Sequence, residues 1–112
     1  MDIQAENHGR TTVVCVVGSV DGMTADSFTS ALQSQIEQGN IELVADLSGV
    51  TYMSSAGLRA LLATVKHARQ CGGDFRLASV LPAVLRVLDM SGFTSILKLY
   101  GDVDTAVSSY TG

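Results

Sequence analysis

Hydrophobic residues recur along the chain with two spacings, one typical of strands and one typical of helices. Short runs that are apolar or alternating predict five strands, at 3–6, 11–17, 41–47, 74–80 and 95–100. Apolar residues three or four positions apart predict four helices, which begin near Thr24, near Ser54 or Ser55, at Pro82 and at Val103. Strands that alternate with helices predict an α/β fold with a mixed, mainly parallel sheet of about five strands and about four helices packed on it.

Turn-forming residues mark the boundaries of these segments. Gly9, Gly22, Gly39 and Gly92 each lie beside a polar turn residue, and the pair at 72–73 ends the second helix. The segment 48–53 has no clear period, and we interpret it as a connecting loop. Three further local expectations are that Thr24 caps the first helix, that Pro82 opens the third, and that Met90 and Phe93 lie in the core.

Length and composition fit one globular domain that spans residues 1–112. The chain is 46% hydrophobic and 16% charged, with a mean hydropathy of +0.30, which argues against disorder. Its longest uninterrupted apolar run, 13–17, is far shorter than the ~20 residues of a membrane helix. The first six residues are polar and acidic, unlike a secretory signal, so we expect a cytoplasmic protein without membrane insertion.

Net charge and the spacing of cysteines and histidines argue against several classes of binding site. The formal net charge is −4 and the seven basic residues are scattered, which disfavours direct binding of nucleic acid. Cys15 lies in an apolar run and is expected to be a core thiol, whereas Cys71 lies at a predicted helix end. Neither cysteine belongs to a CxxC pair. The two cysteines and two histidines lack metal-ligand spacing, and no glycine-rich phosphate loop is present, so we expect neither a metal site nor a cofactor.

Two adjacent serines provide the strongest candidate chemistry. Ser54 and Ser55 follow the third predicted strand at the start of a helix, where free N–H groups and the helix dipole favour an anion. A phosphoryl group there would add about −1.5 to −2 charges at a position already suited to them. The simpler interpretation is that one of the serines only caps the helix.

The residues around these serines resemble the signature of STAS domains, the family of anti-sigma factor antagonists. The resemblance rests on the stretch 46–58, which contains Ser54, Ser55, Gly57 and Leu58. Two further matches are the turn with Gly18, Asp21, Thr24 and Ala25, and the segment from Pro82 to Phe93. The matches occur in the family's order and cover nearly the whole chain, which implies a single STAS-like domain.

The resemblance implies a switch between protein partners. Family members bind an anti-sigma factor that is also a serine kinase, and so free the sigma factor. The kinase phosphorylates a serine at the start of the second helix, which here is Ser55, and a serine phosphatase removes the phosphate. The implied partner surface comprises Asp21, Thr24, Ser54, Ser55, Ala56, Gly57 and Arg59. The chain differs from many members in having Ser54 where they have Asp, and Ala56 where they have Ser or Thr.

Catalysis at Ser55 and a passive adaptor role are the two alternatives to this switch. A catalytic role for Ser55 is disfavoured because His67 lies twelve residues along the same helix, roughly 18 Å away, and no Gly-x-Ser-x-Gly motif occurs. The chain is therefore expected not to be an enzyme. The alternative is a non-phosphorylated STAS adaptor subunit of a transporter or stress-sensing complex. The sequence does not indicate an oligomeric state.

Overall fold

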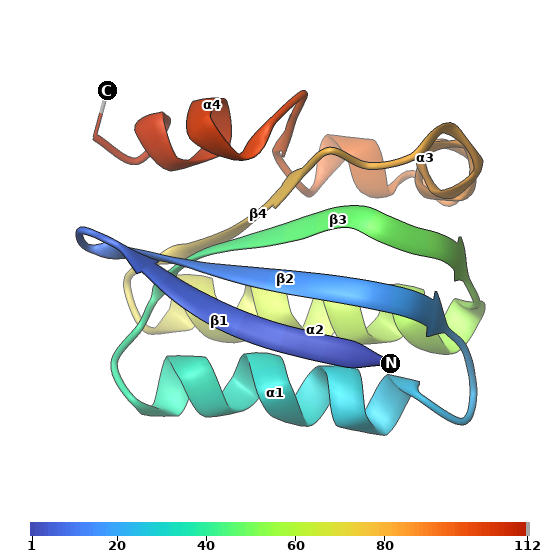
Figure 1. Cartoon of the computed structure of the whole chain (residues 1–112), viewed down its shortest axis with the longest axis horizontal. Coiled ribbons are helices and arrows are strands. Elements are labelled where there is room, and N and C mark those ends of the chain that lie inside the picture. The colour runs from blue at the N-terminus through green and yellow to red at the C-terminus, as the bar shows by residue number, and fades with distance from the viewer. Residues whose placement is uncertain (112) are drawn as a thin grey trace.

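The sheet has five strands whose order across the sheet is their order in the sequence. The computed structural model describes residues 1–111, and Figure 1 shows the strands between layers of helices. β1 pairs antiparallel with β2, and each later strand pairs parallel with the one before it. This arrangement confirms the predicted mixed, mainly parallel sheet. The strands are β1 (Asp2–His8), β2 (Thr11–Val20), β3 (Glu42–Met53), β4 (Asp74–Ala78) and β5 (Leu99–Tyr100).

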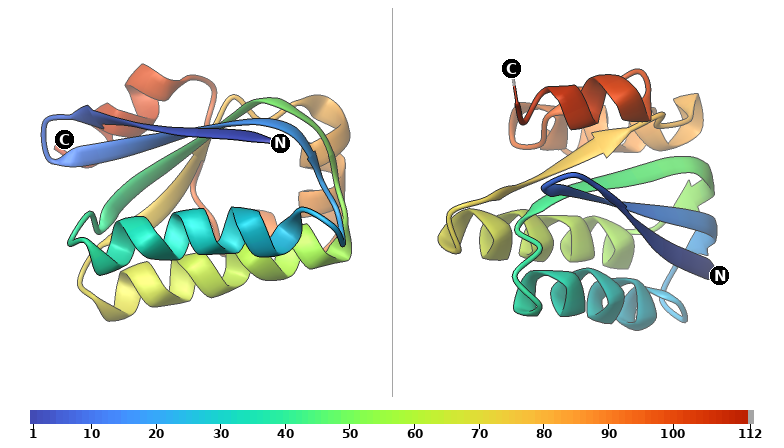
Figure 2. Two further views of the ribbon diagram at one scale, coloured as in Figure 1. Left: turned by 60° about the horizontal axis from the view of Figure 1, so that its bottom comes forward. Right: turned by 60° about the vertical axis from the view of Figure 1, so that its left-hand side comes forward.

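Four α-helices accompany the sheet, as the periodicity predicts. α1 and α2 lie side by side on one face, and α4 lies on the other (Figures 1 and 2). α3 packs against β3 and is followed by η1, a single turn of 3₁₀-helix. The helical segments are α1 (Ala25–Glu37), α2 (Ser55–Gln70), α3 (Pro82–Met90), η1 (Phe93–Ser95) and α4 (Val103–Ser108).

Both faces of the central strands are buried. Successive residues of a strand point to opposite faces, so β2, β3 and β4 each contribute to two apolar clusters. The larger cluster includes residues of α1 and α2, whereas the smaller one includes Ala106 of α4. This double burial explains the continuous apolar run 13–17 of β2, which does not alternate between apolar and polar residues.

β3 is longer than the sequence predicts, and the interpretation of 48–53 as a loop is wrong. The strand continues to Met53 beside β2, with register shifts between Cys15 and Val17 and between Gly18 and Ser19. Gly49 makes this pairing possible, because a Cβ there would lie 2.9 Å from Val17 Cγ2. Gly49, which lies within the predicted loop, is instead a point of close approach between two strands.

Three other expectations need correction. β4 ends at Ala78 rather than residue 80, because Ser79 adopts a left-handed conformation with φ 57° that breaks the strand. Only Leu99 and Tyr100 of the predicted strand 95–100 pair with β4. Met90 is 82% exposed rather than buried, since it lies two residues, or about 200° of helix rotation, beyond the buried Leu88. Phe93, in contrast, packs against the larger core cluster as expected.

A buried carboxylate links α2, β4 and the segment before β5. Asp74 accepts hydrogen bonds from Arg69 Nε at 2.8 Å and Arg76 Nε at 3.1 Å, and Arg69 also donates to the carbonyl of Ile96. The guanidinium of Arg76 lies 3.9 Å from the centre of the Tyr110 ring. Burial by itself would raise the pKa of Asp74, but hydrogen bonds from Arg76, the Phe75 N–H and Arg69 lower it overall.

The two cysteines are free thiols in different surroundings. Cys15 is half-buried with its Sγ 3.9 Å from Asp46 Oδ2, so it lines the smaller cluster rather than the deep core. Burial raises the pKa of the Cys15 thiol, and the carboxylates of Asp46 and Glu6 raise it further. Cys71 is exposed at the end of α2.

Candidate functional site

The structure brings the Asp21 turn and the two serines together at the carboxyl ends of β2 and β3. The last residues of the two strands, Val20 and Met53, are register partners. The N–H of Ser54 donates to the carbonyl of Val20 at 2.8 Å, which continues the pairing by one residue. The loop after β2 therefore emerges directly beside the start of α2, at the same end of the sheet (Figure 1). The carboxyl ends of parallel strands are where α/β proteins usually bind their ligands.

The two serines have different structural roles. Ser54 is the N-cap of α2, with extended backbone geometry, and its side chain accepts the N–H of Gly57 at an Oγ–N distance of 3.4 Å. Ser55 is the first residue of the helix and is exposed. Within residues 1–111 its hydroxyl makes no hydrogen bond. Capping is therefore the role of Ser54, and the Ser55 hydroxyl is left available to an approaching molecule.

Gly57 allows the helix to begin this close to the sheet. A Cβ at this position would lie 2.7 Å from Met53 Cγ and 2.8 Å from Val20 Cγ1, closer than real side chains approach. Both neighbours are buried, and Val20 is branched at Cβ, so neither has much freedom to move aside. The absence of a side chain at Gly57 thus fixes the distance of Ser54 and Ser55 from the strand ends.

The loop after β2 is held by its own side chains. Asp21 Oδ1 accepts the N–H groups of Met23 at 2.9 Å and Thr24 at 3.2 Å. Thr24 Oγ1 donates to the carbonyl of Ser19 at 2.8 Å and accepts the N–H of Asp21 at 2.9 Å. Thr24 occupies the N-cap position of α1, but its hydroxyl makes no capping hydrogen bond, so the expected capping role is wrong. Both polar residues instead shape the loop.

Two exposed apolar side chains lie close to the candidate residues in the sequence, and sequence analysis did not identify them. Met23, at the tip of the loop, is 93% exposed, and Tyr52, two residues before Ser54, is 55% exposed. Tyr52 is the register partner of Ser19, which places it beside the same loop. The signal available in the sequence was their position next to the motif, since neither fits the buried face of a helix or strand. Exposed side chains of this size next to a functional motif are typical of protein interfaces.

The remaining candidate residues lie along the first turns of α2. Ala56 is half-buried and Gly57 is buried, so their contribution to an interface would be shape rather than polar contact. Arg59 is exposed one turn beyond Ser55 and forms no ion pair within the described chain. The first N–H groups of the helix have no partner within the helix, so the local potential favours negative charge near Ser55.

The described residues contain no assembly suited to metal chemistry or to activation of Ser55. No group of three or more His, Cys, Asp or Glu side chains in 1–111 is placed to hold a metal ion. The His67 ring nitrogen hydrogen-bonds Gln33 of α1 and lies well along α2 from Ser55. Within the same residues, every helix is too short or too polar to cross a lipid bilayer.

A family model and two related proteins of known role match most of this chain. The family model of the STAS domain matches residues 2–106. The anti-sigma F factor antagonist of Paenibacillus polymyxa is 31% identical over 112 residues, which cover 99% of this chain and 93% of that protein. The anti-sigma-B factor antagonist of Listeria monocytogenes is 30% identical, with 77% of this chain and 75% of that protein covered.

A solved structure matches over almost the whole chain. The crystal structure of an anti-sigma factor antagonist from Mycobacterium paratuberculosis is 29% identical and superposes with a TM-score of 0.91. The match covers 99% of this chain and 94% of that one. This chain therefore shares its element order, sheet and helix positions with that anti-sigma factor antagonist structure.

Proposed function

The chain belongs to the STAS domain family, and from this membership and the site geometry we propose that it is an anti-sigma factor antagonist controlled by phosphorylation of Ser55. In this proposal it acts in the cytoplasm as a binding protein rather than an enzyme. It binds an anti-sigma factor that is also a serine kinase, which releases the sigma factor, and a serine phosphatase reverses the modification. The binding surface comprises Asp21, Thr24, Ser54, Ser55, Ala56, Gly57 and Arg59, with Met23 and Tyr52 at its border.

The division of roles between the two serines supports this proposal most directly. Ser54 holds the helix start through its cap, whereas Ser55 is exposed and its hydroxyl supports nothing in the fold. A kinase can therefore reach Ser55 without unfolding the helix. The phosphate would enter a region of free N–H groups, so the modified domain would keep its structure.

Phosphorylation would weaken binding through the cost of burying charge. The phosphate adds about −1.5 to −2 charges to the proposed binding surface. The exposed apolar side chains of Met23 and Tyr52 at the border of this surface favour a partner that excludes water. Desolvating such a group costs several kcal/mol unless the partner supplies cations, and about 1.4 kcal/mol already changes affinity tenfold. Arg59, one turn away, can offset only part of this charge across solvent. The switch therefore needs no change of conformation.

Phosphosite mapping and binding measurements with the cognate anti-sigma factor kinase and ATP test the proposal. Wild type should take up one phosphate on Ser55 and dissociate. Ser55→Ala should stay bound with ATP present, and Ser55→Asp should bind more weakly than wild type even without ATP.

Ser54→Ala is the matched control for the neighbouring hydroxyl. It should still take up its phosphate on Ser55, while losing about 1 kcal/mol of stability with the cap. Equal binding by Ser55→Ala, Ser55→Asp and wild type under all nucleotide conditions would refute the switch. Stable capture of unmodified protein by a transporter subunit would instead favour the adaptor role.

A further inference from the structure

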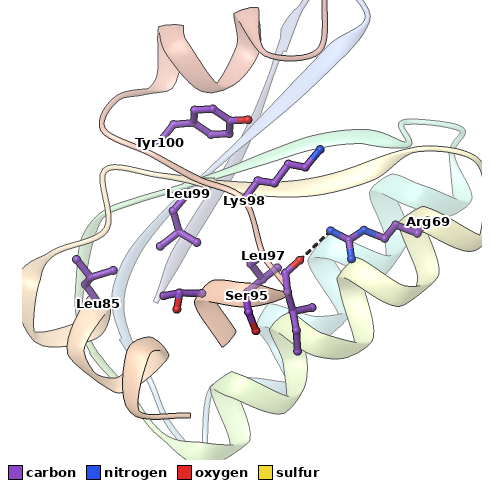
Figure 3. A pocket seen from close by; sticks show the side chains of 9 residues that line it. Arg69, Leu85, Ser95, Leu97, Lys98, Leu99 and Tyr100 are labelled. Atoms are coloured by element: carbon purple, nitrogen blue, oxygen red, sulfur yellow. Dashed lines mark hydrogen bonds between the residues drawn. The ribbon is translucent and has the colours of Figure 1, made fainter. Parts of the chain in front are cut away.

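A groove runs along the edge of the sheet formed by β5. Its main hollow has a volume of about 840 Å³, and a second hollow of about 230 Å³ shares Leu85, Leu99 and Tyr100 with it. Figure 3 shows Leu85 of α3 and Arg69 of α2 on either side of the segment that leads into β5. Leu85 and Ile96 are among the large apolar side chains that the protein leaves exposed. None of the residues that line the groove belongs to the proposed switch surface, and Arg69 lies fourteen residues, or about 21 Å, along α2 from Ser55.

The main chain of β5 has one open side. The carbonyls of Lys98 and Tyr100 accept the N–H groups of Leu77 and Ser79, at 3.0 and 3.1 Å, so these residues face β4. Main-chain groups of successive strand residues alternate in direction, and β5 is the last strand of the sheet. The N–H and C=O of Leu99 therefore point away from β4, toward the open edge. Such an edge is a template for one more strand.

The charge of the groove is opposite to that of the protein as a whole. The chain has a net charge of −4, yet the side chains that line the groove include Arg69 and Lys98 and no carboxylate. Asp74 forms ion pairs with both Arg69 and Arg76, so its single negative charge does not balance the two guanidinium charges. Lys98 is exposed and forms no ion pair within residues 1–111. An occupant of the groove should therefore carry negative charge.

We propose that this groove binds an extended acidic segment of a partner protein, which pairs with β5 as a sixth strand. Main-chain hydrogen bonds to Leu99 would set the register of the segment. Its apolar side chains would cover Leu85 and Ile96, and the carboxylates on its other face would lie near Lys98. This site leaves Ser55 free, so the segment and the anti-sigma factor can bind together. The inference does not depend on the proposed function.

Titration with a model peptide tests this proposal. The probe is a capped hexapeptide of alternating Glu and Val, added to the full ¹⁵N-labelled chain and followed by NMR and by amide hydrogen exchange. The amide of Leu99 should shift and become protected from exchange. Lys98→Glu should raise the Kd about tenfold, which corresponds to about 1.4 kcal/mol. Lys66→Glu, a charge reversal at another exposed lysine, on α2 outside the groove, should leave the Kd unchanged.

Two altered peptides separate the charge from the strand pairing. A hexapeptide of alternating Lys and Val should bind wild type poorly, and it should bind the Lys98→Glu variant more tightly. A Glu-Val peptide that is N-methylated on alternate residues keeps its charges but loses main-chain donors, and it should not protect Leu99. No binding of the Glu-Val probe at millimolar concentration, or shifts centred on Ser55, would overturn the inference. Self-association through the groove, detected by sedimentation without peptide, would overturn it in favour of a second copy as occupant.

Discussion

Replacement of Gly57 by alanine tests whether close packing at the start of α2 determines the position of the two serines. The added Cβ would lie 2.7 Å from Met53 Cγ and 2.8 Å from Val20 Cγ1. Extra volume in a tightly packed region costs about 1–3 kcal/mol, and the better helix propensity of alanine returns at most about 1 kcal/mol. We expect Gly57→Ala to lower the free energy of unfolding by about 1–2 kcal/mol. For a domain of this size the melting temperature should fall by about 4–8 °C.

Urea and thermal unfolding of Gly57→Ala and Gly22→Ala measure this effect. Gly22 lies in the neighbouring loop, without a positive φ, and a Cβ there would meet nothing within 4 Å. Its replacement should leave stability unchanged or raise it by up to about 1 kcal/mol. Val20→Ala removes the methyl group that the new Cβ would meet, so combining it with Gly57→Ala should show a favourable coupling of at least about 0.5 kcal/mol. A Gly57→Ala protein as stable as wild type, with no coupling to position 20, would falsify the packing argument.

Two further predictions concern the buried carboxylate and the thiols. Asp74→Asn should cost about 2–3 kcal/mol at neutral pH, because it removes the carboxylate from two guanidinium groups. Folding lowers the pKa of Asp74, so the carboxylate stabilises wild type above about pH 4, and this contribution is lost as pH falls through the lowered pKa. Urea unfolding from pH 7 to 2.5 should therefore show the two proteins converging, and parallel curves would contradict the ion-pair argument. Ellman's reagent at about pH 8 should label exposed Cys71 at least about tenfold faster than Cys15, whose pKa is raised; equal rates would refute the assigned environments.

The sequence predicts the fold because most segments have a single period. The run 11–17 of β2 is rich in branched residues and lies between Gly9 and Gly18, and α2 has an apolar stripe that ends at a glycine pair. The extension of β3 through Ser48 and Gly49 could not be foreseen, because it depends on a register shift in the neighbouring strand. Met90 was misplaced for a similar reason, since the orientation of α3 on β3 decides which side of the helix is buried.

The sequence also locates the candidate site, but not the roles within it. A helix start at Ser54 or Ser55 follows from the pattern, whereas the choice of cap depends on the hydrogen bond from Ser54 N–H to the Val20 carbonyl. That bond joins residues 34 positions apart, and local spacing does not predict it. The close contact at Gly57 and the exposure of Met23 and Tyr52 likewise arise only when β2 and β3 end side by side.

The agreement between strand order and chain order has a consequence for biosynthesis. Each strand pairs with the one made immediately before it, so a growing polypeptide can add strands one at a time at a single edge. No strand has to be threaded between two that are already joined. The loop after β2, the two serines and their supporting strands all precede residue 60, so this end of the molecule can begin to assemble before the last third of the chain has been made.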